Sequence, residues 1–152
     1  MSFESDWGAA KHSFEVATGK KKPNAKFLGI FHTSGVSDRL KKIDTVLSKG
    51  SLDDVSDAYV ALCKDTSNYK KTLLKTAKED DTANYGTEVK KLSDALDHIA
   101  HEAGLAVNKR KDELREQAEA EAEAEAEEEA RKQARGIISK MLAIIDPLLE
   151  GT

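Results

Sequence analysis

Residues 52–76 read LDDVSDAYVALCKDTSNYKKTLLKT and carry the clearest pattern in the chain. Apolar, tyrosine and threonine side chains recur at alternating spacings of three and four residues, which places them on one face of a helix. The acidic residues Asp53 and Asp54 follow Ser51, as is typical of the start of a helix. The sequence therefore predicts a long amphipathic helix with this face: Leu52, Val55, Tyr59, Leu62, Thr66, Tyr69, Leu73 and Thr76.

A second helix with the same rhythm is predicted over residues 85–106, after a short polar turn at residues 79–82. Two consecutive helices of similar length with a short turn between them favour an antiparallel hairpin. A glycine inside a helix costs about 1 kcal/mol relative to alanine, and we expect the helix to continue through Gly104. Its apolar face comprises Tyr85, Val89, Leu92, Leu96, Ile99, Ala103 and Ala106.

Two shorter helices are predicted upstream of the hairpin. The first begins after Ser2 or Ser5 and ends at Gly19, and the second covers residues 37–49 and stops at Gly50. A short aromatic segment, residues 27–31, lies between them. The fold class expected from these patterns is all-α, an elongated helical bundle or antiparallel hairpin.

The Ala/Glu tract between residues 118 and 127 is unusual because Ala and Glu alternate strictly. Both residue types favour helix over strand, but a period of two distributes them over every face of a helix. Each Glu also has another Glu four residues away, and each such pair costs roughly 0.2–0.5 kcal/mol at low salt. The tract is therefore predicted to be a long helical arm with no apolar face.

An apolar block follows the arm at residues 137–149. A short helix with so wide an apolar surface has to bury it against something. The block either completes the bundle of its own chain or contacts another molecule, and the sequence leaves both arrangements open. The chain is thus divided into an aromatic and basic segment at 1–35, a helical core at 36–114, an acidic arm at 115–136 and an apolar helix at 137–152.

Composition restricts the class of protein further. Hydrophobic residues make up 39% of the 152 residues, aromatic residues 5% and charged residues 34%, as expected for long helices with much solvated surface. No secretory signal or transmembrane run is visible, so a cytoplasmic location is expected. Secretion that uses no cleaved signal would leave no such trace. The single Cys63 is expected to be a small buried hydrophobic residue.

The candidate metal or acid–base residues are His98, His101 and Glu102, which lie close to Asp94 and Asp97. Their spacing places ligand-capable groups on one region of a helix. The order His-Ile-Ala-His-Glu, however, matches neither zinc-protease arrangement, and no second Glu-x-x-His helix is present for a di-iron site. We expect these residues to be solvated flank residues, and we expect no enzymatic activity and no cofactor.

The basic cluster of Lys20, Lys21, Lys22 and Lys26 lacks the glycine frame of a phosphate-binding loop. Too few basic residues and exposed aromatics surround it for recognition of nucleic acid. We expect a solvated turn that complements the acidic part of the chain, and no nucleic-acid partner.

These features together favour a non-enzymatic structural or adaptor protein that forms homo-oligomers or binds a protein partner through helical surfaces. The aromatic residues either dock on that partner or cap the hairpin of their own chain. The alternative is a membrane-associating protein or secreted effector that uses residues 27–31 and 137–149. The expected partner-binding residues are Trp7, Phe14, Phe27, Phe31, Ile137, Ile138, Met141, Leu142, Ile144 and Ile145.

Overall fold

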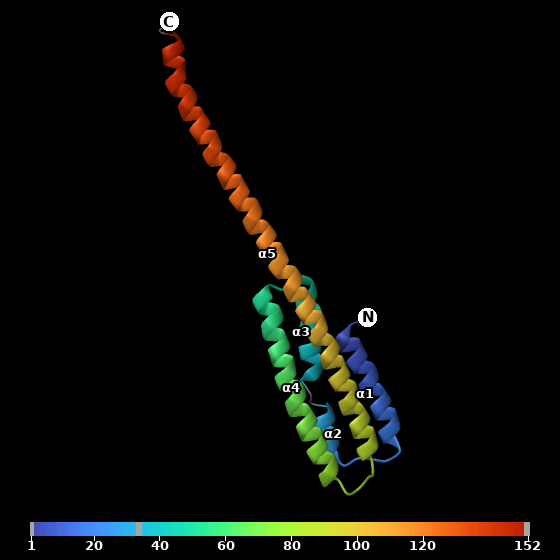
Figure 1. Ribbon diagram of the computed structural model, residues 1–152. Coiled ribbons are helices and arrows are strands. Elements are labelled where there is room, and N and C mark those ends of the chain that lie inside the picture. The colour runs from blue at the N-terminus through green and yellow to red at the C-terminus, as the bar shows by residue number, and fades with distance from the viewer. Residues whose placement is uncertain (1, 33–34, 151–152) are drawn as a thin grey trace. The chain divides into compact units, whose positions relative to one another are not determined.

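The computed structural model describes residues 2–32 and 35–150, with side chains up to residue 145. Within these ranges the chain forms helices and no strand, which confirms the all-α prediction (Figure 1). The helices are α1 (Phe3–Gly19), α2 (Ala25–His32), α3 (Val36–Lys49), α4 (Leu52–Glu79) and α5 (Gly86–Glu150).

The helix ends follow from local hydrogen bonding. Ser2 caps α1, and Asp44 of α3 accepts the N–H groups of Phe3 and Glu4 at 3.0 and 3.1 Å. At the start of α4 the Ser51 hydroxyl accepts the N–H of Asp54, whose carboxylate accepts the N–H of Ser51. Reciprocal capping of this kind satisfies N–H groups that have no partner inside the helix.

The chain divides into two compact units, Met1–Asp112 and Glu113–Thr152, which we call unit 1 and unit 2. Helix α5 belongs to both units, and it continues through Gly104 as the sequence predicts. The finer division at residues 35, 114 and 136 stays a prediction.

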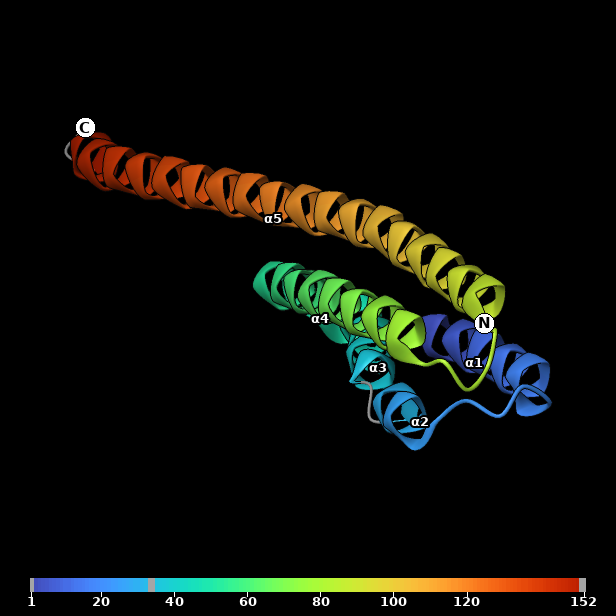
Figure 2. The same ribbon diagram turned by 90° about the horizontal axis from the view of Figure 1, so that it is seen from below.

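Within unit 1, helices α4 and α5 form the predicted antiparallel hairpin (Figure 2). Lys70 near the middle of α4 forms an ion pair with Asp97 of α5 at 2.5 Å, and Tyr59 lies against Gly104. Residue numbers therefore fall along one helix as they rise along the other. The two predicted faces meet in the core, where Val55, Leu62, Leu73, Val89, Leu92 and Leu96 are buried.

Gly104 lies directly against the Tyr59 side chain of α4. A Cβ atom at this position would lie 2.6 Å from the Tyr59 hydroxyl oxygen and 3.1 Å from the ring carbon that carries it. The absence of a side chain thus makes room for Tyr59, which explains a glycine inside a long helix.

We expect Gly104→Ala to lower the free energy of unfolding by about 1 kcal/mol, because overpacking outweighs the gain in helix propensity. In a Tyr59→Leu background the same change should become neutral or stabilising, since the hydroxyl and ring are gone. Urea unfolding of the two single variants and the double variant measures this coupling. A Gly104→Ala protein that is more stable than the wild type would show that Tyr59 does not restrict the site.

Asp80 joins three parts of unit 1 at the turn between α4 and α5. Its carboxylate is buried and accepts four hydrogen bonds. The donors are the Asn24 N–H at 2.8 Å, the Tyr85 hydroxyl at 2.7 Å, and the N–H and hydroxyl of Thr82 at 2.9 and 2.5 Å. The turn is thereby tied to the loop that precedes α2.

Candidate interaction surface

The N-terminal aromatic residues are positioned by α1 and α2 in the core of unit 1. Trp7, Phe14, Phe27 and Phe31 are at most 5% exposed. The Trp7 ring packs edge-on against Tyr69 of α4 at 5.8 Å between centroids. The structure thus corrects their assignment as partner-binding residues, because their side chains pack against their own chain.

The aromatic cluster extends to the start of α5. Phe14 and Phe31 lie 4.9 Å apart between ring centroids, and Phe27 lies 4.7 Å from Tyr85. Aromatic pairs at such distances contribute beyond the area that they bury. The cluster therefore fastens α1 and α2 to the hairpin. Segment 27–31, which the membrane alternative uses, retains only Leu28 as an exposed large apolar side chain.

The C-terminal apolar residues have the opposite environment. Every described side chain from residue 115 to residue 145 is exposed. Six large apolar side chains in this part of α5 are between 43% and 68% exposed: Ile137, Ile138, Met141, Leu142, Ile144 and Ile145. We call these six residues the terminal face.

The terminal face covers one side of α5. At 100° per residue, its six positions fall within an arc of roughly 160°, with Met141 near the middle. Ile137 and Ile144 lie on one side of Met141, and Ile138 and Ile145 lie on the other. The exposed apolar side chains are therefore contiguous and form a continuous surface, whereas exposed apolar residues that are scattered singly are ordinary.

Charge changes abruptly just before the terminal face. Residues 116–129 contain eight Glu and no basic residue, whereas residues 131–145 contain four basic residues and no acidic one. Lys132 is 3.8 Å from Glu128, a pair of the i,i+4 type on the helix surface. Residues 131–145 thus carry a net positive charge, with Asp146 directly after them, and the helix before them is strongly anionic.

The histidine-rich part of α5 does not form a metal centre among the described residues. His98, His101 and Glu102 are exposed, and Asp97 is paired with Lys70. In the part of the chain that the structure describes, no three His, Cys, Asp or Glu side chains are placed to hold a metal ion. These side chains are therefore solvated polar groups on the surface of unit 1.

Two lysines of the basic cluster form ion pairs within unit 1. Lys21 pairs with Glu88 of α5 at 2.5 Å, and Lys26 pairs with Glu79 of α4 at 3.2 Å. The hydrogen bond from Lys21 is the main reason that the pKa of Glu88 lies below its ordinary value. Lys21 thus connects the loop after α1 with α5, and Lys26 connects α2 with α4.

The prediction that Cys63 is a buried hydrophobic residue is wrong, because its side chain is exposed on α4. It lies one position beyond Leu62 and therefore just outside the buried face. A hydrogen bond with the Cys63 thiol, together with burial, raises the pKa of Tyr59. Periodicity alone does not show whether a residue at the edge of an apolar face is buried or exposed.

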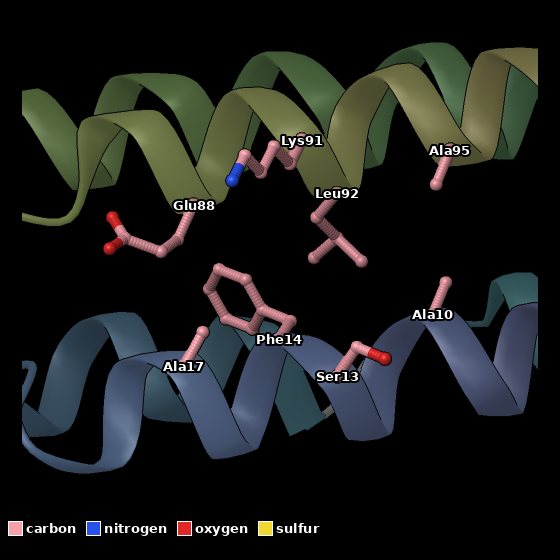
Figure 3. Close-up of a pocket in the computed structure, with 8 residues that line it drawn as sticks. All are labelled: Ala10, Ser13, Phe14, Ala17, Glu88, Lys91, Leu92 and Ala95. Carbon is pink, nitrogen blue, oxygen red and sulfur yellow. The ribbon is translucent and has the colours of Figure 1, made fainter.

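A groove of about 360 Å³ lies between α1 and the first turns of α5 in unit 1 (Figure 3). Phe14 and Leu92 point into it, and small side chains such as Ala10 and Ala95 line its length. Glu88 at one end is already paired with Lys21. The other polar side chains that line the groove are Ser13 and Lys91.

The part of the chain that the structure describes contains no helix with a stretch long and apolar enough to cross a bilayer. Comparison of the chain with protein-family models, with curated proteins and with solved structures gives no match. The terminal face is therefore identified as the candidate interaction surface from its exposure and its chemistry alone.

Proposed function

We propose that this chain is a non-enzymatic structural or adaptor protein that assembles with itself or with another protein through the terminal face. One observation carries the proposal: the six apolar side chains of that face are 43–68% exposed. Apolar residues of the same size on the hairpin faces of unit 1, such as Leu62 and Leu96, are fully buried.

The terminal face carries enough apolar side chains to stabilise a complex. Full burial of an Ile, Leu or Met side chain stabilises a complex by roughly 1.5–3 kcal/mol relative to leaving it in water. Even partial burial of six such side chains offsets much of the entropy lost on association. Contiguous exposed apolar surface of this kind is characteristic of protein–protein contact sites.

The properties of unit 1 fit the same proposal. It has its own core, built from the aromatic cluster and the two hairpin faces. Two lysines of its basic cluster form ion pairs within unit 1, Lys21 with Glu88 and Lys26 with Glu79. A folded unit whose last helix continues into a segment with an exposed apolar face is suited to join molecules rather than to transform a substrate.

Deletion of residues 137–152 tests the proposal. We expect the deleted protein to have a lower assembly state by light scattering, because its binding surface is gone. Unit 1 should keep its helical circular dichroism and its thermal transition, since none of its core residues is removed. An unchanged mass would place the interface elsewhere, and unfolding of unit 1 would assign residues 137–152 to its core.

A further inference from the structure

We propose that the occupant of the terminal face is a second copy of this chain, bound antiparallel about a twofold axis near Met141. The inference rests on the proposed function and specifies the partner and its orientation. It is carried by two independent observations, the symmetry of the apolar positions and the distribution of charge along α5.

The first observation is that five of the six apolar positions of the terminal face are symmetric about Met141, whereas Leu142 has Lys140 as its counterpart. Isoleucine occurs three and four residues before it, at Ile138 and Ile137, and three and four residues after it, at Ile144 and Ile145. All five side chains are 43–68% exposed. A parallel pair aligns each residue with itself whatever the sequence, so it does not require this symmetry.

An antiparallel pair makes use of it, because the twofold axis brings residues before Met141 in one copy beside residues after Met141 in the other. With the axis at Met141, Ile138 of one copy lies beside Ile145 of the other, on the same side of the apolar face. Ile137 lies beside Ile144 on the opposite side in the same way. Isoleucine thus meets isoleucine in four places, and the two Met141 side chains meet at the axis.

The second observation is the acidic tract that precedes the terminal face. Residues 116–129 carry eight Glu and no base. In a parallel pair the two tracts would run side by side with helix axes about 8–10 Å apart, close to one Debye length. The antiparallel pair separates the tract centres by about 55 Å, at 1.5 Å per residue, which removes the repulsion between them.

The cationic side chains around the face are compatible with this arrangement. Lys140 lies at the edge of the apolar arc, so its ammonium group stays in water while its aliphatic stem covers apolar surface. The four basic residues at 131–145 would also suit an anionic lipid surface. Lipid binding is therefore the competing outcome of the experiment.

Cysteine pairing distinguishes the orientations. In a Cys63→Ser background, Ile138→Cys and Ile145→Cys chains are mixed under mild oxidation and digested with trypsin. Cleavage after Arg135 and Lys140 places the two cysteines in different peptides, 136–140 and the peptide that begins at residue 141. The antiparallel pair predicts a disulfide between these two peptides.

Ile138→Cys alone should give little self-linkage, because two copies of residue 138 lie about 9 Å apart along the axis, beyond the roughly 7 Å limit for a disulfide. Met141→Cys should link to itself, and Ser139→Cys on the opposite face should not. Self-linkage of Ile138→Cys as fast as that of Met141→Cys would overturn the orientation while leaving the proposed function intact.

The mass of the wild-type protein completes the test. A higher mass at high protein concentration that falls on dilution supports a second copy, because a short interface of this kind is weak. A protein that stays monomeric with no linkage at Met141→Cys overturns the second copy. If that monomer sediments with phosphatidylserine vesicles, the occupant is a lipid surface. If the mass stays high after residues 137–152 are deleted, the proposed function itself fails.

Discussion

Replacing Trp7 with alanine should lower the free energy of unfolding of unit 1 by about 3–5 kcal/mol, the range observed when large aromatic residues are removed from a core. Trp7 is fully buried, and its ring packs edge-on against Tyr69. Removing it leaves a large cavity between α1 and α4. Chemical denaturation followed by circular dichroism measures the change.

Two further variants make this prediction specific. Trp7→Phe should be much milder, because it keeps an aromatic ring and because the indole N–H has no hydrogen-bond partner among the described residues. Val16→Ala on the exposed side of α1 should change stability by less than about 0.5 kcal/mol. If the Trp7→Ala protein is as stable as the wild type but assembles less, Trp7 contributes to a partner-binding surface rather than to the core.

Asp80→Asn should strongly destabilise unit 1 at neutral pH and should also change how stability depends on pH. Burial alone would raise the pKa of Asp80, but hydrogen bonds from Asn24, Thr82 and Tyr85 outweigh burial and hold its pKa well below the ordinary value. A carboxylate with a depressed pKa stabilises the folded state above its unfolded pKa of about 3.9.

That contribution is lost as the pH falls from about 4 toward the folded-state pKa. The stability difference between wild type and Asp80→Asn should therefore be largest near neutral pH and should shrink below about pH 4. Thermal unfolding at several pH values measures it. Asp81→Asn, at the exposed neighbouring position, is the matched control and should have little effect. A difference that does not change with pH would show that the Asp80 charge contributes nothing.

The sequence predicted the helices of the hairpin well because their physical signal is local. Spacings of three and four residues report directly which side chains share a face, and the members of those faces, from Val55 to Leu73 and from Tyr85 to Ala103, are largely the residues that are buried. Ser51 and Gly50 likewise marked a real boundary, because capping chemistry depends on neighbouring residues only.

The placement of the aromatic residues could not be predicted in the same way. Whether Phe14 and Phe27 face a partner or their own chain depends on how α1 and α2 pack against α3 and α4, which is a tertiary property. The helical state of residues 25–32 was not predicted either, because eight residues form too short a periodic signal. The sequence places Asp80 in a polar turn. No feature of the sequence shows that its carboxylate accepts four hydrogen bonds from separate segments.

The terminal face is the opposite case, since its composition alone indicated an apolar surface that has to be buried. What the sequence left open was whether residues 137–145 complete their own bundle or contact another molecule, and that choice stays a prediction. The symmetry about Met141 is already present in the sequence. It becomes meaningful only when those positions are known to be exposed on a helix.

The most direct test of an assembly surface at the terminal face is the solution mass of the full chain carrying Ile137→Ser, Met141→Ser and Ile144→Ser together. The matched control carries Val16→Ser, Val60→Ser and Leu105→Ser, which replace exposed apolar residues of unit 1. The proposed role predicts that light scattering gives a lower mass for the first variant and the wild-type mass for the control. Equal masses for both variants and the wild type would contradict it.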